Sequence, residues 1–425
     1  MASLAVTLNT AEQTLMNTQT ELATSSNNIS NASTAGYARQ TAVQTENRQV
    51  LTTNGWMGSG ASISTISQAR DDYLEQQFMN ATSSDSQYTT QTSQLTTIQT
   101  AAMDSGNSGI SQALGNFFDS WSTLAQNPTA PAEQTAVYSA AQNLATSIQS
   151  TYGQLSNVND QITSQVTNTV NQANTLLNQI AQLNQNIQAS NATAQPNALL
   201  DQRYQSMDNL AKLIPVSFTT NSDGTVDVNT TENSSTVNLV SGRTVVGTVA
   251  SDSGITGGQL GGLLQAQTNL SGYMSSFDDF AGTIAGQVNS VSGLNVFSGS
   301  NSSSIAANSG FLSGLTSDQL SSVTQSMANL QDSAVSFSDG TTGTPQQYLS
   351  NIQQTIGQDV QGANNNQTYY DALKSQLQTQ QQSVSGVSVD EEMVNVIQYQ
   401  QIYQAAAKVV QTVSNLMSTV INMVQ

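Results

Sequence analysis

Residues 393–425 read MVNVIQYQQIYQAAAKVVQTVSNLMSTVINMVQ, and this stretch decides the fold. Apolar residues recur in it in steps that alternate four and three, and they are Tyr399, Tyr403, Ala406, Val410, Val413, Met417 and Val420. A second stripe widens the same face and consists of Ile402, Val409, Leu416 and Met423. Asn, Gln, Ser and Thr fill most of the positions between. The spacing predicts a long amphipathic helix with one face to bury.

The N-terminus repeats this pattern over about four heptads. Its apolar positions are Leu4, Leu8, Ala11, Leu15, Leu22 and Ile29, with Thr18 and Ser25 in register between them. A helix of about 30 residues with one apolar stripe is marginal alone and must pair. We therefore expect the first and last helices to pack together in an antiparallel bundle. We also expect these ends to become ordered only as they join copies of the chain or adjoining subunits.

Two interior segments, residues 133–189 and 260–291, carry the same heptad periodicity and predict further long helices. Shorter helices are predicted over residues 63–98, 110–124, 199–214 and 348–384. Residues 216–250 differ, because their valines alternate with polar residues around the Asp223-Gly224 turn. That pattern predicts a small β insertion.

The predicted fold class is mainly α, a coiled-coil-like helical bundle formed by the N- and C-terminal segments with a small β-rich inserted outer domain. We divide the chain into a terminal helical domain (residues 1–62 and 386–425), a long-helix bundle (63–214 and 256–385) and the β insertion (215–255).

Composition excludes several kinds of chemistry. The 425 residues include no His and no Cys, so no imidazole base, thiol nucleophile or His–Cys metal site can form. Only 8% of residues are charged, the net charge is −19, and Ser, Thr, Asn and Gln make up roughly 47% of the chain. The negative charge argues against nucleic acid and anionic lipid as partners. We expect no enzyme activity, no cofactor, no metal and no membrane insertion.

Two sequence features could indicate ligand binding or catalysis, and each also has a structural interpretation. The stretch from Gly257 to Gly262, GGQLGG, precedes a helix as a phosphate-binding loop would, but it lacks the Gly-Lys-Ser/Thr of that loop. We interpret it as a turn with close backbone packing. Acids such as Asp201 or Asp227 could serve a secreted carbohydrate-active enzyme or adhesin. That alternative requires a concave pocket holding two carboxylates within about 5–10 Å.

Local signals mark the inner ends of the terminal helices. Ser388 and Glu391 form a capping-box pattern that predicts where the last helix begins. Residues 25–40, SSNNISNASTAGYARQ, close the first helix, and Gly36 predicts a tight turn against which Tyr37 packs, with Arg39 as a rare cation.

Residues 25–40 resemble the N-terminal signature of the bacterial flagellar axial proteins, a family of rod, hook and hook-associated proteins. The matching positions include Asn27, Asn28, Asn31, Gly36, Tyr37 and Arg39. The C-terminal stretches SGVSVDEEMVN (385–395) and QYQQIYQAAAKV (398–409) are similar to the closing helix of the same family. The segments LLDQR (199–203) and 257–264 lie in the order typical of its hook-associated members.

The resemblance implies a structural function at the hook–filament junction. It implies helical self-assembly in a ring, contact with hook protein and the adjacent junction protein, and a cytoplasmic export chaperone at the C-terminal helix. It also implies type III export to the extracellular flagellum without a cleaved signal peptide, and the N-terminal residues lack the basic start and apolar run of such a signal. A flagellar hook or rod protein is the nearest alternative.

Overall fold

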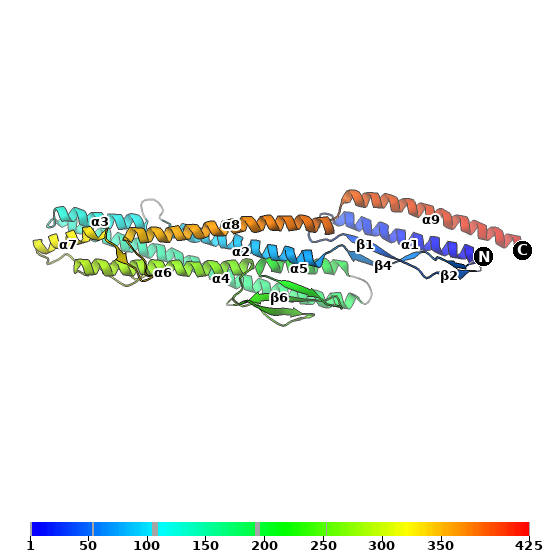
Figure 1. Cartoon of the computed structure of the whole chain (residues 1–425), viewed down its shortest axis with the longest axis horizontal. Coiled ribbons are helices and arrows are strands. Elements are labelled where there is room, and N and C mark those ends of the chain that lie inside the picture. Colours follow the sequence, from blue (N-terminus) through cyan, green and yellow to red (C-terminus); the bar gives the residue numbers. More distant parts are fainter. Residues whose placement is uncertain (1, 53–54, 104–108, 192–195, 252, 425) are drawn as a thin grey trace. The chain divides into compact units, whose positions relative to one another are not determined.

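The computed structural model describes residues 2–52, 55–103, 109–191, 196–251 and 253–424 (Figure 1). The chain divides into two compact units. Unit 1 comprises residues 1–83, 172–250 and 371–425, and unit 2 comprises residues 84–171 and 251–370. The fold is mainly helical with small inserted β-sheets, which confirms the predicted class. The division into terminal, long-helix and outer domains stays a prediction.

Unit 1 holds both ends of the chain. Its helical parts are α1 (Ala2–Asn31), the start of α2 (Asp72–Ala102), the end of α4 (Pro131–Asn191), α5 (Asn197–Leu213), the end of α8 (Pro345–Ser385) and α9 (Val389–Val424). Its strands are β1 (Gln40–Glu46), β2 (Val50–Thr52), β3 (Gly55–Met57), β4 (Ala61–Gln68), β5 (Ser217–Thr220), β6 (Val226–Glu232), β7 (Ser235–Ser241) and β8 (Thr244–Val245).

Helices α1 and α9 lie side by side and run in opposite directions (Figure 1). Asn28 bonds Glu392 at one end of the pair, and the small buried residues Ala11 and Ala406 lie nearer the other. This confirms the predicted antiparallel pairing. Each terminal helix has its apolar partner within the same chain. That these ends become ordered only as they join neighbouring subunits stays a prediction.

Residues 63–68 form a strand, so the predicted helix over 63–98 is wrong in its first turns. β4 pairs with β1 in antiparallel register from Gln40↔Gln68 to Glu46↔Ala61, with a shift between Val43 and Gln44. The β4 sequence ASISTISQ is rich in Ile, Ser and Thr, and β-branched residues favour strands. The helix begins only at Asp72, where the Asp71 carboxylate accepts hydrogen bonds from the following backbone N–H groups.

Strands β5 to β8 form the predicted β insertion, a four-stranded antiparallel sheet in sequential order. The Asp-Gly turn joins β5 to β6, and Gly224 adopts φ +83°, a left-handed conformation that favours glycine. Asn184 of α4 fastens the sheet, since its amide donates to the Val226 carbonyl at 2.8 Å and its oxygen accepts from the Val226 N–H at 3.2 Å.

Unit 2 is a helical unit with short strand pairs. It contains the rest of α2, the start of α4 and the start of α8, together with α3 (Ile110–Gln126), α6 (Gly258–Ser292), α7 (Ser317–Leu330) and the strands β9 (Phe297–Ser298), β10 (Ala306–Ala307), β11 (Val335–Ser336) and β12 (Thr342–Gly343). Phe117, Trp121, Phe277 and Phe280 are among its fully buried side chains. The predicted helices over residues 110–124, 260–291 and 348–384 fall within α3, α6 and α8.

Charge is divided unevenly between the units. All eight Lys and Arg residues belong to unit 1, whereas unit 2 contains 12 Asp and Glu residues and no cation. Neutral polar side chains must therefore make most of the hydrogen bonds with water on the surface of unit 2.

The glycine-rich stretch at the start of α6 is a packing feature, as interpreted from the sequence. A β-carbon on Gly262 would lie 2.3 Å from the carbonyl oxygen of Gln87 on α2, and one on Gly261 would lie 2.4 Å from the carbonyl carbon of Thr256. Gly258 adopts φ +66°. These glycines let the helix start approach neighbouring backbone closely.

We predict that Gly262→Ala destabilises the chain by about 1–3 kcal/mol, because the added methyl overlaps backbone that no rotamer change can move. Gly286→Ala in the same helix is the control. Its β-carbon meets nothing within 4 Å, so the substitution is expected to be neutral or stabilising by up to about 1 kcal/mol. Urea unfolding followed by circular dichroism measures both, and equal effects would contradict the packing role.

Candidate functional site

The predicted assembly residues lie in two environments. On α1 they are half-buried, and these are Leu4, Leu8, Leu15, Leu22 and Ile29. On α9, Val413 is buried, whereas Tyr399, Val410, Met417 and Val420 are half-buried. Tyr403 is exposed. Most of the predicted set thus contributes to packing inside one chain, and the surface left for neighbours lies beside it.

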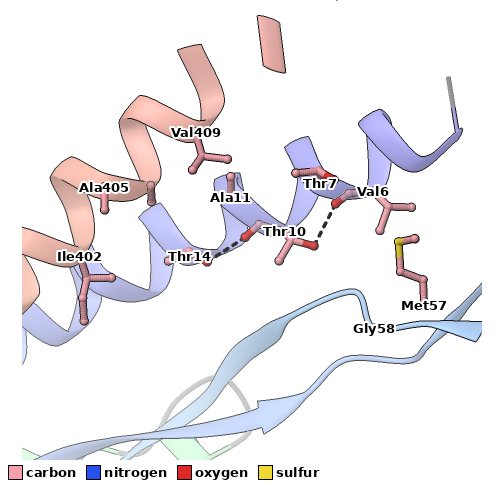
Figure 2. A pocket seen from close by; sticks show the side chains of 11 residues that line it. Val6, Thr7, Thr10, Ala11, Thr14, Met57, Gly58, Ile402, Ala405 and Val409 are labelled. Carbon is pink, nitrogen blue, oxygen red and sulfur yellow. Dashed lines mark hydrogen bonds between the residues drawn. The ribbon is translucent and has the colours of Figure 1, made fainter. Parts of the chain in front are cut away.

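An apolar groove of about 410 Å³ runs along the seam between α1 and α9 (Figure 2). Val6 and Thr10 line it from α1, and Ile402 and Val409 line it from α9. Small side chains at the helix contact keep it open, and these include Ala11, Ala405 and Ala406. The Thr10 and Thr14 hydroxyls donate to carbonyls of their own helix, so they add little unsatisfied polarity.

The second stripe of α9 borders this groove and continues past it. Ile402, Val409, Leu416 and Met423 are all exposed, Leu416 by 49% and Met423 by 81%. Their seven-residue spacing keeps them on one side of the helix, next to the row that faces α1. The stripe is therefore an unpaired helix face rather than an extension of the buried one.

The strand pair β2–β3 adds a feature that sequence reasoning missed. Met57 reaches into the groove from β3 (Figure 2). On the other face of the pair, Leu51 lies opposite Trp56, and these side chains are 64% and 69% exposed. The sequence offered one signal for this feature, because Trp56 is one of only two Trp residues in the chain. Its exposed position beside an apolar groove is typical of an interaction surface.

Asn28 of the signature turn organises the inner end of the terminal pair. Its side-chain oxygen accepts from the Gln40 N–H at 2.9 Å and from the Tyr37 hydroxyl at 2.8 Å. Its amide donates to the Gln40 carbonyl at 2.9 Å and to the buried carboxylate of Glu392 at 3.0 Å. One side chain thereby ties α1 to β1 and to α9. Burial, with the charges of Asp201 and Glu392, raises the pKa of Tyr37 to about 12.

A buried ion-pair network lies behind this turn. Arg70 contacts Glu75 and Asp201 at 2.8 Å each and also donates to the Gly36 carbonyl. Gln381 of α8 donates to Glu75 at 2.6 Å. Burial raises the pKa of both carboxyl groups, and Arg70 opposes that rise. The network joins the turn to α2, α5 and α8 and holds the base of the terminal pair.

The remaining signature residues serve the turn itself. Gly36 adopts φ +78°, and a β-carbon there would lie 2.7 Å from the Gln205 side-chain oxygen. The Asn31 amide donates to the Asn27 carbonyl at 3.0 Å, and the Tyr37 hydroxyl reaches the Asn27 side chain at 3.4 Å. Arg39 lies 3.9 Å from Glu391, and both side chains are exposed enough that this pair adds little stability.

One half of the predicted capping box of the last helix is present. The Ser388 hydroxyl accepts from the Glu391 N–H at 3.4 Å, and α9 begins at Val389. The Glu391 carboxylate points to Arg39. The neighbouring residue Glu392 is buried and accepts a hydrogen bond from the Asn28 amide. The sequence did not reveal that Glu391 is exposed near Arg39 whereas Glu392 is buried against Asn28.

The acids singled out for a possible hydrolase are engaged in structural bonds. Asp201 accepts from Arg70, from Gln68 at 2.9 Å and from the Ala38 N–H at 3.3 Å. Asp227 accepts from the Gly242 N–H at 2.6 Å and from Asn221 at 3.1 Å. Asp201 lines a polar pocket of about 480 Å³ whose described lining holds no second acid. Across the described residues, no group of three acidic side chains is arranged to hold a metal ion.

Replacing Asn28 tests its organising role. Asn28→Ala leaves the Glu392 carboxylate and the Gln40 backbone without their partners, so we expect a loss of about 2–4 kcal/mol in the free energy of unfolding. Asn31→Ala removes only local, exposed hydrogen bonds to Asn27 and Thr34 and is expected to cost less than about 0.5 kcal/mol. Chemical denaturation measures both values, and similar losses would contradict the assignment.

A second prediction concerns Asp208 of α5, which keeps one buried carboxylate oxygen without a hydrogen-bond partner. Burial and the negative charge of Glu75 raise its pKa to about 7. Because an unfolded Asp has a pKa of about 3.9, the folded state binds more protons between these values, and the contribution of Asp208 to stability falls as pH rises from about 4 to about 7.

Asp208→Asn is therefore expected to stabilise the chain by about 1–3 kcal/mol near pH 8 and to have little effect near pH 4. Denaturation at both pH values, with the exposed Asp390→Asn as control, measures the difference. A gain independent of pH would rule out ionisation of Asp208 as the cause.

Comparison with family models finds three matches. The model described as the flagellar hook-associated protein FlgK helical domain matches residues 95–301. The model of the flagellar basal body rod FlgEFG protein C-terminal matches residues 378–423, and that of the flagella basal body rod protein matches residues 8–37. The last two cover most of α9 and most of α1, including the Asn28 turn.

Among curated proteins, flagellar hook-associated protein 1 of Bacillus subtilis is 24% identical over 99% of this chain and 99% of its own length. The proteins of the same name from Salmonella typhimurium and Escherichia coli are 33% and 30% identical over 52% of this chain. The match spans only about two fifths of those two relatives, 40% and 41%.

A solved structure, the flagellar hook junction protein FlgK from Burkholderia pseudomallei, aligns with 28% identity and a TM-score of 0.45. The alignment covers 50% of this chain and 43% of that one. The helical-domain model and the full-length relative name the same family of hook-associated proteins, and the two rod-protein models match the ends of the chain. The chain belongs to the family of flagellar hook-associated protein 1, the FlgK proteins.

Proposed function

We propose that this chain is a structural subunit of the bacterial flagellum that forms the hook–filament junction by helical self-assembly through α1 and α9. The observation that carries the proposal is the exposed apolar stripe of α9 beside the groove it shares with α1. Contiguous apolar surface of this kind marks a protein–protein interface.

The charge distribution supports association along this face. Residues 393–425 contain a single charged residue, Lys408, and α1 contains only Glu12 and Glu21. Copies that approach through α1 and residues 393–425 bring few like charges together, although each chain carries a net charge of −19. Fully burying one exposed Leu, Ile, Val or Met side chain contributes about 1.5–3 kcal/mol, so covering the stripe favours association.

The partner we propose for the stripe is a second copy of the chain, in a ring. Leu416 and Met423 continue the stripe past the groove that Ile402 and Val409 line. An interface that joins this part of the stripe on one copy to the groove of the next is heterologous and continues from copy to copy. The exposed Leu51–Trp56 pair lies on strands that border the same groove and adds apolar area to this surface. Hook protein and the adjacent junction protein are the further partners proposed at the two sides of the ring.

Before assembly the apolar stripe of α9 is exposed to solvent, and a binding partner would shield it. We propose that a cytoplasmic export chaperone binds α9 and that the chain then leaves through the flagellar type III channel to the extracellular flagellum. Within the described residues, no helix combines the length and the apolar character that crossing a membrane requires.

A hook or rod protein is the second candidate, because two of the matching family models describe basal body rod proteins. The hook-associated assignment is favoured by residues 95–301, which match a hook-associated helical domain and form long helices in the structure.

The stripe gives a sharper test than the row that faces α1, because Val410 and Met417 are partly buried inside the chain. We predict that Leu416→Asp leaves the melting temperature of the purified chain nearly unchanged but prevents junction formation and motility in a null strain. Gln411→Asp adds the same charge on the opposite, exposed side of α9 and is expected to restore motility. Normal motility with Leu416→Asp would refute the proposed interface.

A further inference from the structure

A cavity of about 260 Å³ in unit 1 has two arginines in its wall. It lies where β4, α5 and the β5–β6 turn meet, and its lining includes Ser67, Arg70, Arg203, Tyr204, Thr220 and Gly224. The volume is several times the roughly 30 Å³ that one water molecule occupies in the liquid. The segment LLDQR contributes Arg203 and is therefore part of this wall.

Arg203 is a buried cation without a paired anion. It is only 2% exposed, and its guanidinium donates to the Asn184 side-chain oxygen at 3.2 Å and the Gly224 carbonyl at 2.6 Å. Its Nε is buried and has no hydrogen-bond partner. In the part of the chain that the structure describes, no carboxylate forms an ion pair with it. A buried charge left in this state is costly.

Arg70 brings a second positive charge to the same wall. Its guanidinium carbon lies 4.3 Å from the Tyr204 ring centre, and that of Arg203 lies 5.7 Å from it. The Nε of Arg70 is also buried without a partner. Burial lowers the pKa of Arg203, and the like charge of Arg70 lowers it further. Two guanidinium groups therefore lie in the wall of one cavity. The terminal nitrogens of Arg70 already bond Glu75, Asp201 and the Gly36 carbonyl, so within the described residues Arg203 is the one of the two without a carboxylate partner.

The nearby carboxylates are already engaged. Glu75 and Asp201 pair with Arg70. The Asp72 oxygens accept from the Tyr204 hydroxyl at 2.6 Å and from the Thr220 hydroxyl at 3.1 Å, and the Asp72 side chain is exposed. These groups weaken the positive field of the cavity, and among the described residues none of them forms an ion pair with Arg203.

We propose that this cavity binds a small tetrahedral oxyanion, of which inorganic phosphate and sulfate are examples, between Arg203 and Arg70. Guanidinium groups match such anions in charge and in the geometry of their donors. The bound anion supplies the missing counter-charge and fastens α5 to the β insertion and to β4. Because three carboxylates lie nearby, the expected affinity is modest, with a dissociation constant on the order of 1 mM.

The test uses inorganic phosphate as the probe and the full chain as the protein. The midpoint of thermal unfolding is followed as sodium phosphate is added, against sodium chloride at matched ionic strength. An anion that binds only the folded chain raises this midpoint in a saturable way, and we expect a rise of a few °C. Phosphorus NMR line broadening of the phosphate on titration with the unmodified chain measures binding without any variant.

Two substitutions and a control separate the site from general salt effects. Arg203→Gln removes the cation, and Ser67→Asp places a carboxylate at the cavity in place of the anion. Both are expected to abolish the phosphate response, and Ser67→Asp is expected to leave the chain folded. Arg243→Gln, at an exposed arginine outside the cavity, is expected to keep the response. An equal response in all variants, or no saturable NMR broadening with the unmodified chain, would mean an adventitious ion only and would overturn the proposal.

Discussion

The antiparallel contact of α1 with α9 is the interaction on which the rest of unit 1 depends. Neither helix is stable alone in water, and each presents a row of apolar side chains to the other. Ala11 and Ala406 are buried in this contact, and a groove remains beside them. The pair buries one row of α9 and leaves the next row uncovered, so the same helix packs within the chain and still presents an apolar face to solvent.

A polar side chain and a buried ion-pair network together fix the geometry at the base of this pair. Asn28 alone makes contacts with α9, with the turn and with β1, and the ion pairs of Arg70 join the turn to α2, α5 and α8. In the LLDQR segment, Asp201 bonds the turn and Arg203 bonds the β insertion. Two residues one helical half-turn apart thereby connect the terminal pair with the β-sheet.

The sequence predicted the elements with strong periodicity. Heptad spacing located the terminal helices and their pairing, and the Asp-Gly turn located the β insertion. The β1–β4 pair was missed because Ser, Thr and Ile in β4 carry little contrast between its two faces. The roles of Arg70 and Glu392 could not be predicted, because contacts between residues 131 or 364 positions apart leave no local pattern. For the same reason, all of the predicted interface residues except Tyr403 proved to be at least partly buried within the chain.

The absence of Lys and Arg from unit 2 has a consequence for crowded copies. Twelve negative charges without a compensating cation repel the same set on any neighbour. That repulsion extends about 30 Å in very dilute salt and about 8 Å at physiological ionic strength. Two copies of unit 2 brought side by side in dilute salt therefore repel each other more strongly than at physiological ionic strength.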